Sequence, residues 1–70
     1  MNDIKMTLKA LRINNNFTQQ EAGEKLGVTK DTISRWENAK SFPDAMQIKA
    51  IEKLYHVTYN NIIFLSKDNA

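Results

Sequence analysis

The residues whose chemistry stands out lie close together, between positions 30 and 35. The guanidinium of Arg35 could donate two parallel hydrogen bonds to one guanine, and the ammonium of Lys30 could contact guanine or a phosphate. Thr32 offers a hydroxyl and a methyl group that can meet the methyl of thymine. Asp31 has two possible roles, as an acceptor for cytosine or as a charge that stabilises the start of a helix. Together these side chains indicate a surface that could contact DNA bases.

Two short helices joined by a tight turn are expected to position these side chains. The first is predicted over 18–26 and ends at Gly27, because glycine readily adopts the left-handed conformation of a helix stop. The second is predicted over 30–37, with Trp36 facing the core. Gly23 has no side chain, so the second helix can cross close over the first. The segment therefore has the features of a helix-turn-helix.

Three further helices are predicted around this pair. Apolar spacing and turn residues place them at 4–13, 45–55 and 59–65, with Thr58 as the cap of the last. Leu8 and Leu11 should lie in the core, and the polar tail 66–70 should fray. The expected fold class is all-α, a compact bundle of five short helices in a single domain over residues 1–70.

Composition limits the possible functions. The chain has 70 residues, no cysteine, one histidine and a net charge of +2, so neither a metal nor another cofactor is expected. It has no nucleophile with a nearby base, no paired carboxylates and no phosphate-cradling glycine loop, which argues against an enzyme or a small-molecule substrate. No apolar run approaches the roughly 20 residues of a membrane span. A cytoplasmic protein without a membrane partner is expected.

The chain resembles the Cro/repressor-type (XRE-type) helix-turn-helix family. The resemblance extends from Leu8 to Ile62 and is carried by LKALR, by FTQQEAGEKLGVTKDTISRWENAK, and by FPD with IKAIEKLYHVTYNNI. It implies five packed α-helices in a lambda-repressor-like domain. It also implies sequence-specific binding to a double-stranded DNA operator, usually as a symmetric homodimer.

The resemblance assigns roles to individual residues. By position, the base-contacting residues are Lys30, Asp31, Thr32 and Arg35, and the phosphate-contacting residues are Gln19, Thr18, Asn38 and Lys40. Arg12 and Glu37 occupy positions that commonly form a structural salt bridge between the first and third helices. Helix three is thereby expected to read the operator from the major groove.

Signals at the helix ends support these boundaries, with one exception. Thr18 with Glu21 and Asp44 with Gln47 have the spacing of capping boxes. His56 stands where the family frequently has glycine, so it must end the preceding helix without glycine's conformational freedom.

The expected function is a transcriptional regulator, a repressor of the kind found in phage or plasmid switches. The last predicted helix carries more apolar groups than it can bury, and Tyr59, Ile63 and Phe64 are expected to form a dimer or partner surface. The alternative is a protein-interaction module that acts as an antirepressor or modulator by binding another repressor.

Overall fold

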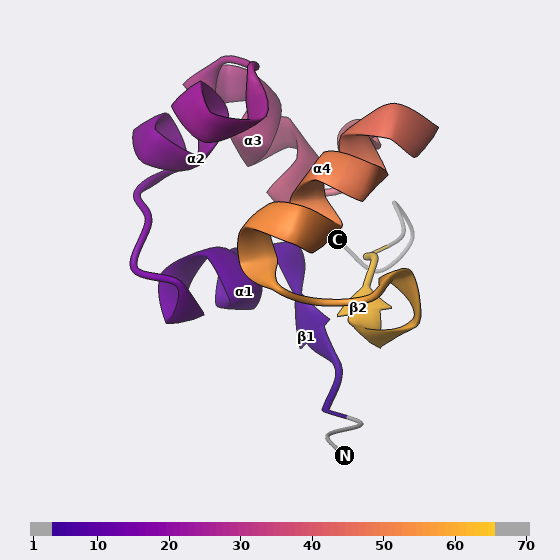
Figure 1. Ribbon diagram of the computed structural model, residues 1–70. Coiled ribbons are helices and arrows are strands. Elements are labelled where there is room, and N and C mark those ends of the chain that lie inside the picture. Colours follow the sequence, from indigo (N-terminus) through magenta and orange to yellow (C-terminus); the bar gives the residue numbers. More distant parts are fainter. Residues whose placement is uncertain (1–3, 66–70) are drawn as a thin grey trace.

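Four α-helices and two very short strands make up the part of the chain that the computed structural model describes, residues 4–65 (Figure 1). The elements in chain order are β1 (Met6–Thr7), α1 (Leu8–Asn14), α2 (Gln19–Leu26), α3 (Lys30–Glu37), α4 (Ala45–Tyr55), a 3₁₀ turn (Tyr59–Asn61) and β2 (Ile62–Ile63). The expected frayed tail, 66–70, lies outside the described residues.

The α2–α3 pair forms as predicted, with a tight turn between the two helices. Gly27 ends α2 in the left-handed conformation, with φ at 75°. Gly23 is buried under the turn, against the backbone of Val28 and Thr29. Figure 1 shows α2 and α3 crossing at one end of the molecule, so that α3 is held across α2 rather than alongside it.

Side-chain caps fix the starts of α2, α3 and α4, as one also does at α1. Both predicted capping boxes are present: Thr18 and Glu21 bond reciprocally at α2, and Asp44 and Gln47 do so at α4. At α3, the Thr29 hydroxyl accepts from the backbone N–H of Thr32 at 3.1 Å. These caps satisfy amide groups that lack a partner within the helix, and thereby set where each helix begins.

The first helix is shorter than the sequence pattern suggests. A helix over 4–13 was expected, but α1 begins at Leu8, because the Thr7 hydroxyl accepts from the N–H of Ala10 at 3.1 Å and caps it. The residues before it form β1 instead, in which Met6 pairs in parallel with Ile62. Ile4, which fits the helical apolar pattern, lies largely exposed before β1.

The expectation of a fifth helix over 59–65 is wrong. The segment forms one 3₁₀ turn and then β2, and the side chain of Thr58 makes no capping hydrogen bond. Ile62 and Ile63 are β-branched, which favours an extended backbone, and the segment pairs in parallel with β1. The fold is therefore mostly helical with a small strand pair, in place of an all-α bundle of five helices.

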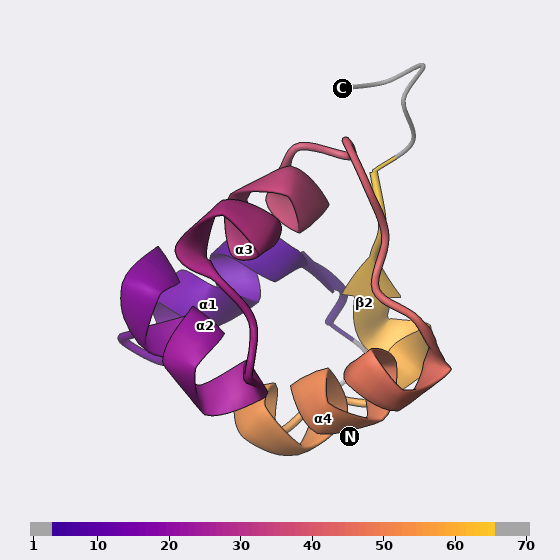
Figure 2. The ribbon, with the colours of Figure 1, turned by 90° about the horizontal axis from the view of Figure 1, so that it is seen from above.

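The core lies where α1, α2, α3 and α4 face one another. Its buried apolar residues are Leu8, Leu11, Ala22, Ile33, Trp36, Ile51, Tyr55 and Ile62. Viewed from above, α1, α2 and α3 group on one side and α4 runs along another (Figure 2). The expected core positions of Leu8, Leu11 and Trp36 are confirmed. Among residues 4–65, no helix is both long enough and apolar enough to cross a lipid bilayer.

Candidate nucleic-acid interface

Helix α3 has one buried face and one face open to solvent. Ile33 and Trp36 are buried in the core, whereas Lys30, Asp31 and Arg35 are exposed. Thr32 and Ser34, also on α3, are half-buried. The structure thus places the four predicted base-contacting residues on a single short helix, where three of them are exposed and Thr32 is half-buried.

The start of α3 uses part of the hydrogen-bonding capacity of Thr32. Its hydroxyl lies 2.9 Å from the hydroxyl of Thr29, and its backbone N–H donates to the same Thr29 oxygen. Asp31 lies in the first turn of α3, where a negative charge favours the positive end of the helix dipole. A carboxylate in that place can also accept a hydrogen bond from a base, so both of its possible roles fit the structure.

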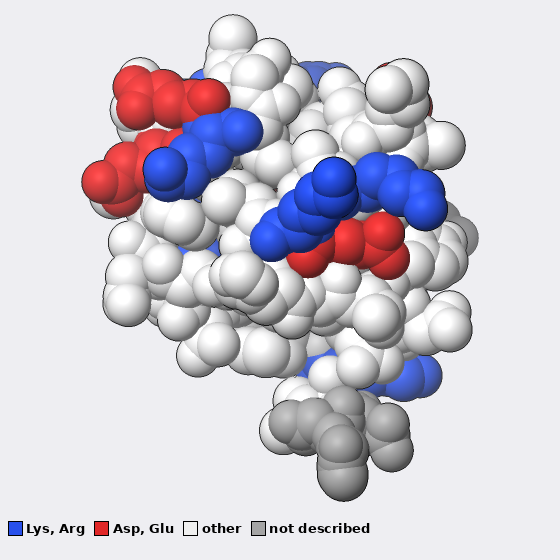
Figure 3. Space-filling view, in the orientation of Figure 1, with Lys and Arg blue, Asp and Glu red and all other residues white. Residues whose placement is uncertain are grey.

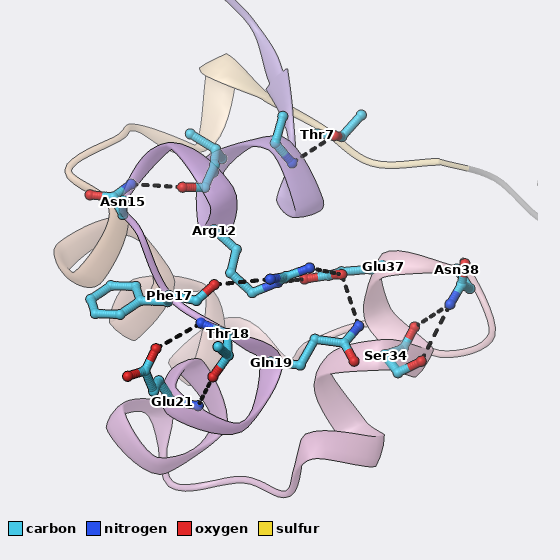
Figure 4. A network of polar contacts seen from close by, with 12 residues as sticks. Thr7, Arg12, Asn15, Phe17, Thr18, Gln19, Glu21, Ser34, Glu37 and Asn38 are labelled. Carbon is cyan, nitrogen blue, oxygen red and sulfur yellow. Dashed lines mark hydrogen bonds and ion pairs between the residues drawn. The ribbon is translucent and has the colours of Figure 1, made fainter.

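The loop after α3 folds back onto the helix. The Asn38 amide donates to the Ser34 carbonyl at 2.9 Å, which ends α3 (Figure 4). Ala39 then adopts a left-handed conformation with φ at 59°, and the Lys40 N–H donates to the carbonyl of Arg35 at 2.8 Å. Lys40 is exposed, so the loop presents an ammonium group next to the end of α3. Sequence reasoning did not predict the left-handed conformation of Ala39, because alanine rarely adopts it.

The N-terminus of α2 keeps two backbone N–H groups without a helical acceptor. The first helical bond runs from Ala22 to the Thr18 carbonyl, and the capping box satisfies the N–H groups of Thr18 and Glu21. The N–H groups of Gln19 and Gln20 remain at the positive end of the helix dipole, an arrangement that favours an anion. The carboxylate of Glu21 lies in the same turn and partly opposes that preference.

A buried ion pair joins α1, α2 and α3, as Figure 4 shows. Arg12 Nε donates to Glu37 Oε2 at 2.7 Å and its Nη2 donates to Oε1 at 3.1 Å, so the salt bridge expected between them is present. Arg12 Nη1 also donates to the Phe17 carbonyl at 2.9 Å, just before α2. The hydrogen bond to Glu37 raises the pKa of Arg12 above its ordinary value. Gln19 joins the network, its Nε2 donating to Glu37 Oε1 at 3.1 Å.

The link between Gln19 and Glu37 is the feature that sequence reasoning missed. Gln19 was expected to face a phosphate, and its contact with the end of α3 depends on how α2 and α3 cross. No local pattern encodes that crossing except the small residue at Gly23.

Charge is not uniformly positive over the molecule. On the face shown in Figure 3, over α2 and α4, Lys and Arg side chains stand beside Asp and Glu side chains. The exposed basic residues of α3 and its following loop, Lys30, Arg35 and Lys40, have one exposed acidic neighbour in α3, Asp31. The two surfaces therefore differ in how well they suit a polyanion.

The expected partner surface is built differently from the prediction. Tyr59 belongs to the 3₁₀ turn and Ile63 to β2, where they are 53% and 40% exposed. Phe64 is half-buried and its ring centroid lies 5.7 Å from that of Tyr59.

Within the described part of the chain, no group of three or more His, Asp or Glu side chains could hold a metal ion.

Comparison with known proteins gives related sequences over most of the chain. A stretch of 56 residues, 80% of this chain, is 36% identical to the HTH-type transcriptional activator BcrR of Enterococcus faecalis and spans 28% of that protein. A stretch of 52 residues, 70% of this chain, is 36% identical to the type II methyltransferase M1.ScrFI of Lactococcus lactis subsp. cremoris and spans 13% of it. The matched stretches thus span less than a third of either relative.

The helix-turn-helix family profile matches residues 8–61. This range covers α1 to α4 and the 3₁₀ turn, and leaves β1 and β2 just outside it at either end. The match includes most of the chain, and the crossed α2–α3 pair has the geometry of the motif. The chain therefore belongs to the helix-turn-helix family of Cro/repressor (XRE) type.

Proposed function

We propose that this chain binds duplex DNA, with α3 in the major groove, and regulates transcription. The observation that carries the proposal is the division of α3 between a buried face, with Ile33 and Trp36, and an exposed face bearing Lys30 and Arg35. Membership of the helix-turn-helix family and the match to a named transcriptional activator support it.

Base recognition falls to the exposed face of α3. Arg35 is the main candidate for specificity, since a bidentate contact to guanine is worth about 1–3 kcal/mol of discrimination. Lys30 contacts guanine or phosphate. Thr32 has its hydroxyl partly engaged by Thr29, so its methyl group is the better candidate for a contact, with thymine as the base. Asp31 accepts from cytosine or stabilises the start of α3.

Phosphates are held on either side of this helix. At the N-terminus of α2, the N–H groups of Gln19 and Gln20 favour an anion, and the Thr18 hydroxyl can still donate one hydrogen bond. On the other side, Lys40 supplies a charge. Asn38 is exposed on the same side, and its amide donates to the Ser34 carbonyl at 2.9 Å and to the Ser34 hydroxyl at 3.4 Å, so a contact with the DNA backbone would replace the longer of these two bonds.

A single copy offers few phosphate contacts, so we propose that two copies bind a symmetric operator. Half-sites about 34 Å apart, one turn of DNA, would suit a two-fold dimer. The exposed side chains of Tyr59 and Ile63, with Phe64 beside them, are the proposed contact between copies. Repression is the simplest outcome, because a protein bound over a promoter blocks it without further contacts. A reporter gene under the selected operator would distinguish repression from activation.

The test is selection of bound sequences from random duplex DNA at low salt, followed by affinity measurement. Lys30→Ala and Arg35→Ala should each weaken binding, and Arg35→Ala should also relax the selected sequence at one position. Lys53→Ala, at an exposed position of α4, makes the same charge change away from α3 and is the matched control. Failure to enrich any sequence would reject the proposal.

A second candidate function is binding to another repressor as an antirepressor or modulator. The exposure of Tyr59 and Ile63 favours it, because apolar side chains at a surface can be covered by a partner protein. In that case Lys30→Ala and Arg35→Ala would leave the activity intact, while Ile63→Glu would abolish it.

A further inference from the structure

We infer that Glu37, the last residue of α3, positions the Gln19 side chain for its contact with a DNA phosphate. The inference rests on the proposed function and concerns how the phosphate contact is built. The hydrogen bond from Gln19 Nε2 to Glu37 Oε1, at 3.1 Å, joins the start of α2 to the end of α3.

The acceptor in this bond is itself fixed. Glu37 is only 8% exposed, and its two carboxylate oxygens receive Arg12 Nε at 2.7 Å and Nη2 at 3.1 Å. Arg12 is anchored in turn to the Phe17 carbonyl, two residues before Gln19 in the chain. The Gln19 amide is therefore held against a buried group that cannot swing away from α2.

One donor of the amide remains for DNA. A glutamine amide nitrogen carries two N–H groups, and the bond to Glu37 uses one of them. Gln19 is half-buried at the first position of α2, beside the N–H groups that favour an anion. Because the guanidinium of Arg12 offsets the negative charge of Glu37, the carboxylate can lie this near a phosphate at reduced electrostatic cost.

The bond to Glu37 restrains the Gln19 side chain before DNA binds, and this lowers the entropic cost of the phosphate contact. A side chain that is already held in one conformation loses less rotamer freedom when it contacts its ligand. The neighbouring Gln20 gives the contrast, because it is exposed and its amide bonds the exposed Glu24 of the same helix at 3.2 Å. Gln20 is thus the matched control for a glutamine without a buried anchor.

The decisive variants are Gln19→Asn and Gln19→Ala, which leave the buried ion pair intact. Asparagine keeps the amide but is one methylene shorter, so it cannot hold the same bond to Glu37. If Glu37 positions Gln19, both variants weaken DNA binding alike, by about two- to tenfold, the range for one hydrogen bond. The loss should be equal for operator and random duplexes, because a phosphate contact carries no sequence information. Gln20→Ala should change affinity by less.

Two outcomes of this comparison would overturn the inference. One is Gln19→Asn binding as tightly as the unchanged chain, since a free amide would then serve as well as a held one. The other is a loss confined to the operator, which would indicate a disturbed α3 rather than a lost phosphate contact. Lys40→Ala provides a reference: removing a charged contact should lower the slope of log affinity against log salt by about one, and changing the neutral Gln19 should not.

A measurement without DNA keeps the inference separate from the proposed function. In NMR relaxation experiments on the free chain, the side-chain amide of Gln19 should be more ordered than that of Gln20. Equal mobility would overturn the inference even if DNA binds. Absence of binding by the unchanged chain would instead reject the proposed function, and that result would be evident before any variant is compared.

Discussion

A Cβ atom placed on Gly23 would lie 2.7 Å from the carbonyl oxygen of Val28. It would also lie 3.2 Å from the backbone of Thr29 and 3.3 Å from that of Lys30. The start of α3 therefore rests directly on the backbone of α2, and there is no room between them for one methyl group.

Gly23→Ala should destabilise the fold. The extra methyl group meets backbone rather than a flexible side chain, and overpacking of this kind costs about 1–3 kcal/mol. The better helix propensity of alanine returns only about 0.5–1 kcal/mol. Urea unfolding would measure the difference, with Glu24→Ala at the adjacent exposed position of α2 as the control. An unchanged or higher free energy of unfolding for Gly23→Ala would show that the turn can move to admit the methyl group.

His56→Gly should stabilise the fold. His56 ends α4 with φ at 55° and ψ at 53°, a left-handed conformation that costs a residue with a side chain about 1–2 kcal/mol. Glycine removes that cost but gains freedom in the unfolded chain, so a net gain of about 1 kcal/mol is expected. In thermal unfolding this corresponds to roughly 4–8 °C for a domain of this size. His56→Ala, which keeps a Cβ atom, should give no such gain.

Stability should fall in alkali because of Tyr55. Burial, and secondarily the negative charge of Glu37, raises the pKa of Tyr55 to about 12. In the unfolded chain its pKa is about 10, so between pH 10 and 12 only the unfolded state loses this proton. The contribution of Tyr55 is therefore fully present below pH 10 and is lost as the pH rises through 12.

Unfolding by urea at pH 7 and pH 11 would measure this effect. Tyr55→Phe should lose less stability between the two values than the unchanged chain, since phenylalanine does not titrate. The unchanged chain and Tyr55→Phe contain the same lysines, so any effect of the lysines cancels when the two are compared. If Tyr55→Phe loses as much stability between the two pH values as the unchanged chain, the titration of Tyr55 makes no contribution.

Removing one member of the Arg12–Glu37 pair should be far worse than removing both. Arg12→Met leaves Glu37 buried without its counter-charge, a change that typically costs about 3–5 kcal/mol. A domain this small has only about 3–5 kcal/mol in total, so the single variant should be largely unfolded at 25 °C. Adding Glu37→Leu removes the stranded charge and should restore most of the helical circular dichroism. If the double variant shows no more helical circular dichroism than Arg12→Met alone, the loss of stability comes from lost packing and not from the stranded charge.

The sequence predicts elements well where the signal for both ends is local. Helix α4 begins at its predicted residue because Asp44 and Gln47 cap its start. The α2–α3 pair is equally local, with a cap, a glycine stop and a second cap in one short run. In each case neighbouring residues carry all the information.

Long-range contacts account for what the sequence did not predict. Ile4 continues the apolar spacing of Leu8 and Leu11, yet the chain before Leu8 pairs with Ile62 and Ile63. The apolar spacing of residues 59–65 likewise gave no indication that Ile62 and Ile63 pair with β1. The bond between Gln19 and Glu37 is of the same kind, since it forms only once α2 and α3 have crossed.

The two strands join the beginning and the end of the described chain, and this fixes their place in the order of folding. Pairing Met6 with Ile62 closes a loop that contains every helix, and closing so large a loop is entropically unfavourable until those helices have packed. The strand pair should therefore close after the helices and reopen before them. Its amides should exchange with solvent sooner than those of the core helices, and each opening would expose the buried side chain of Ile62 to water while α1 to α4 remain folded.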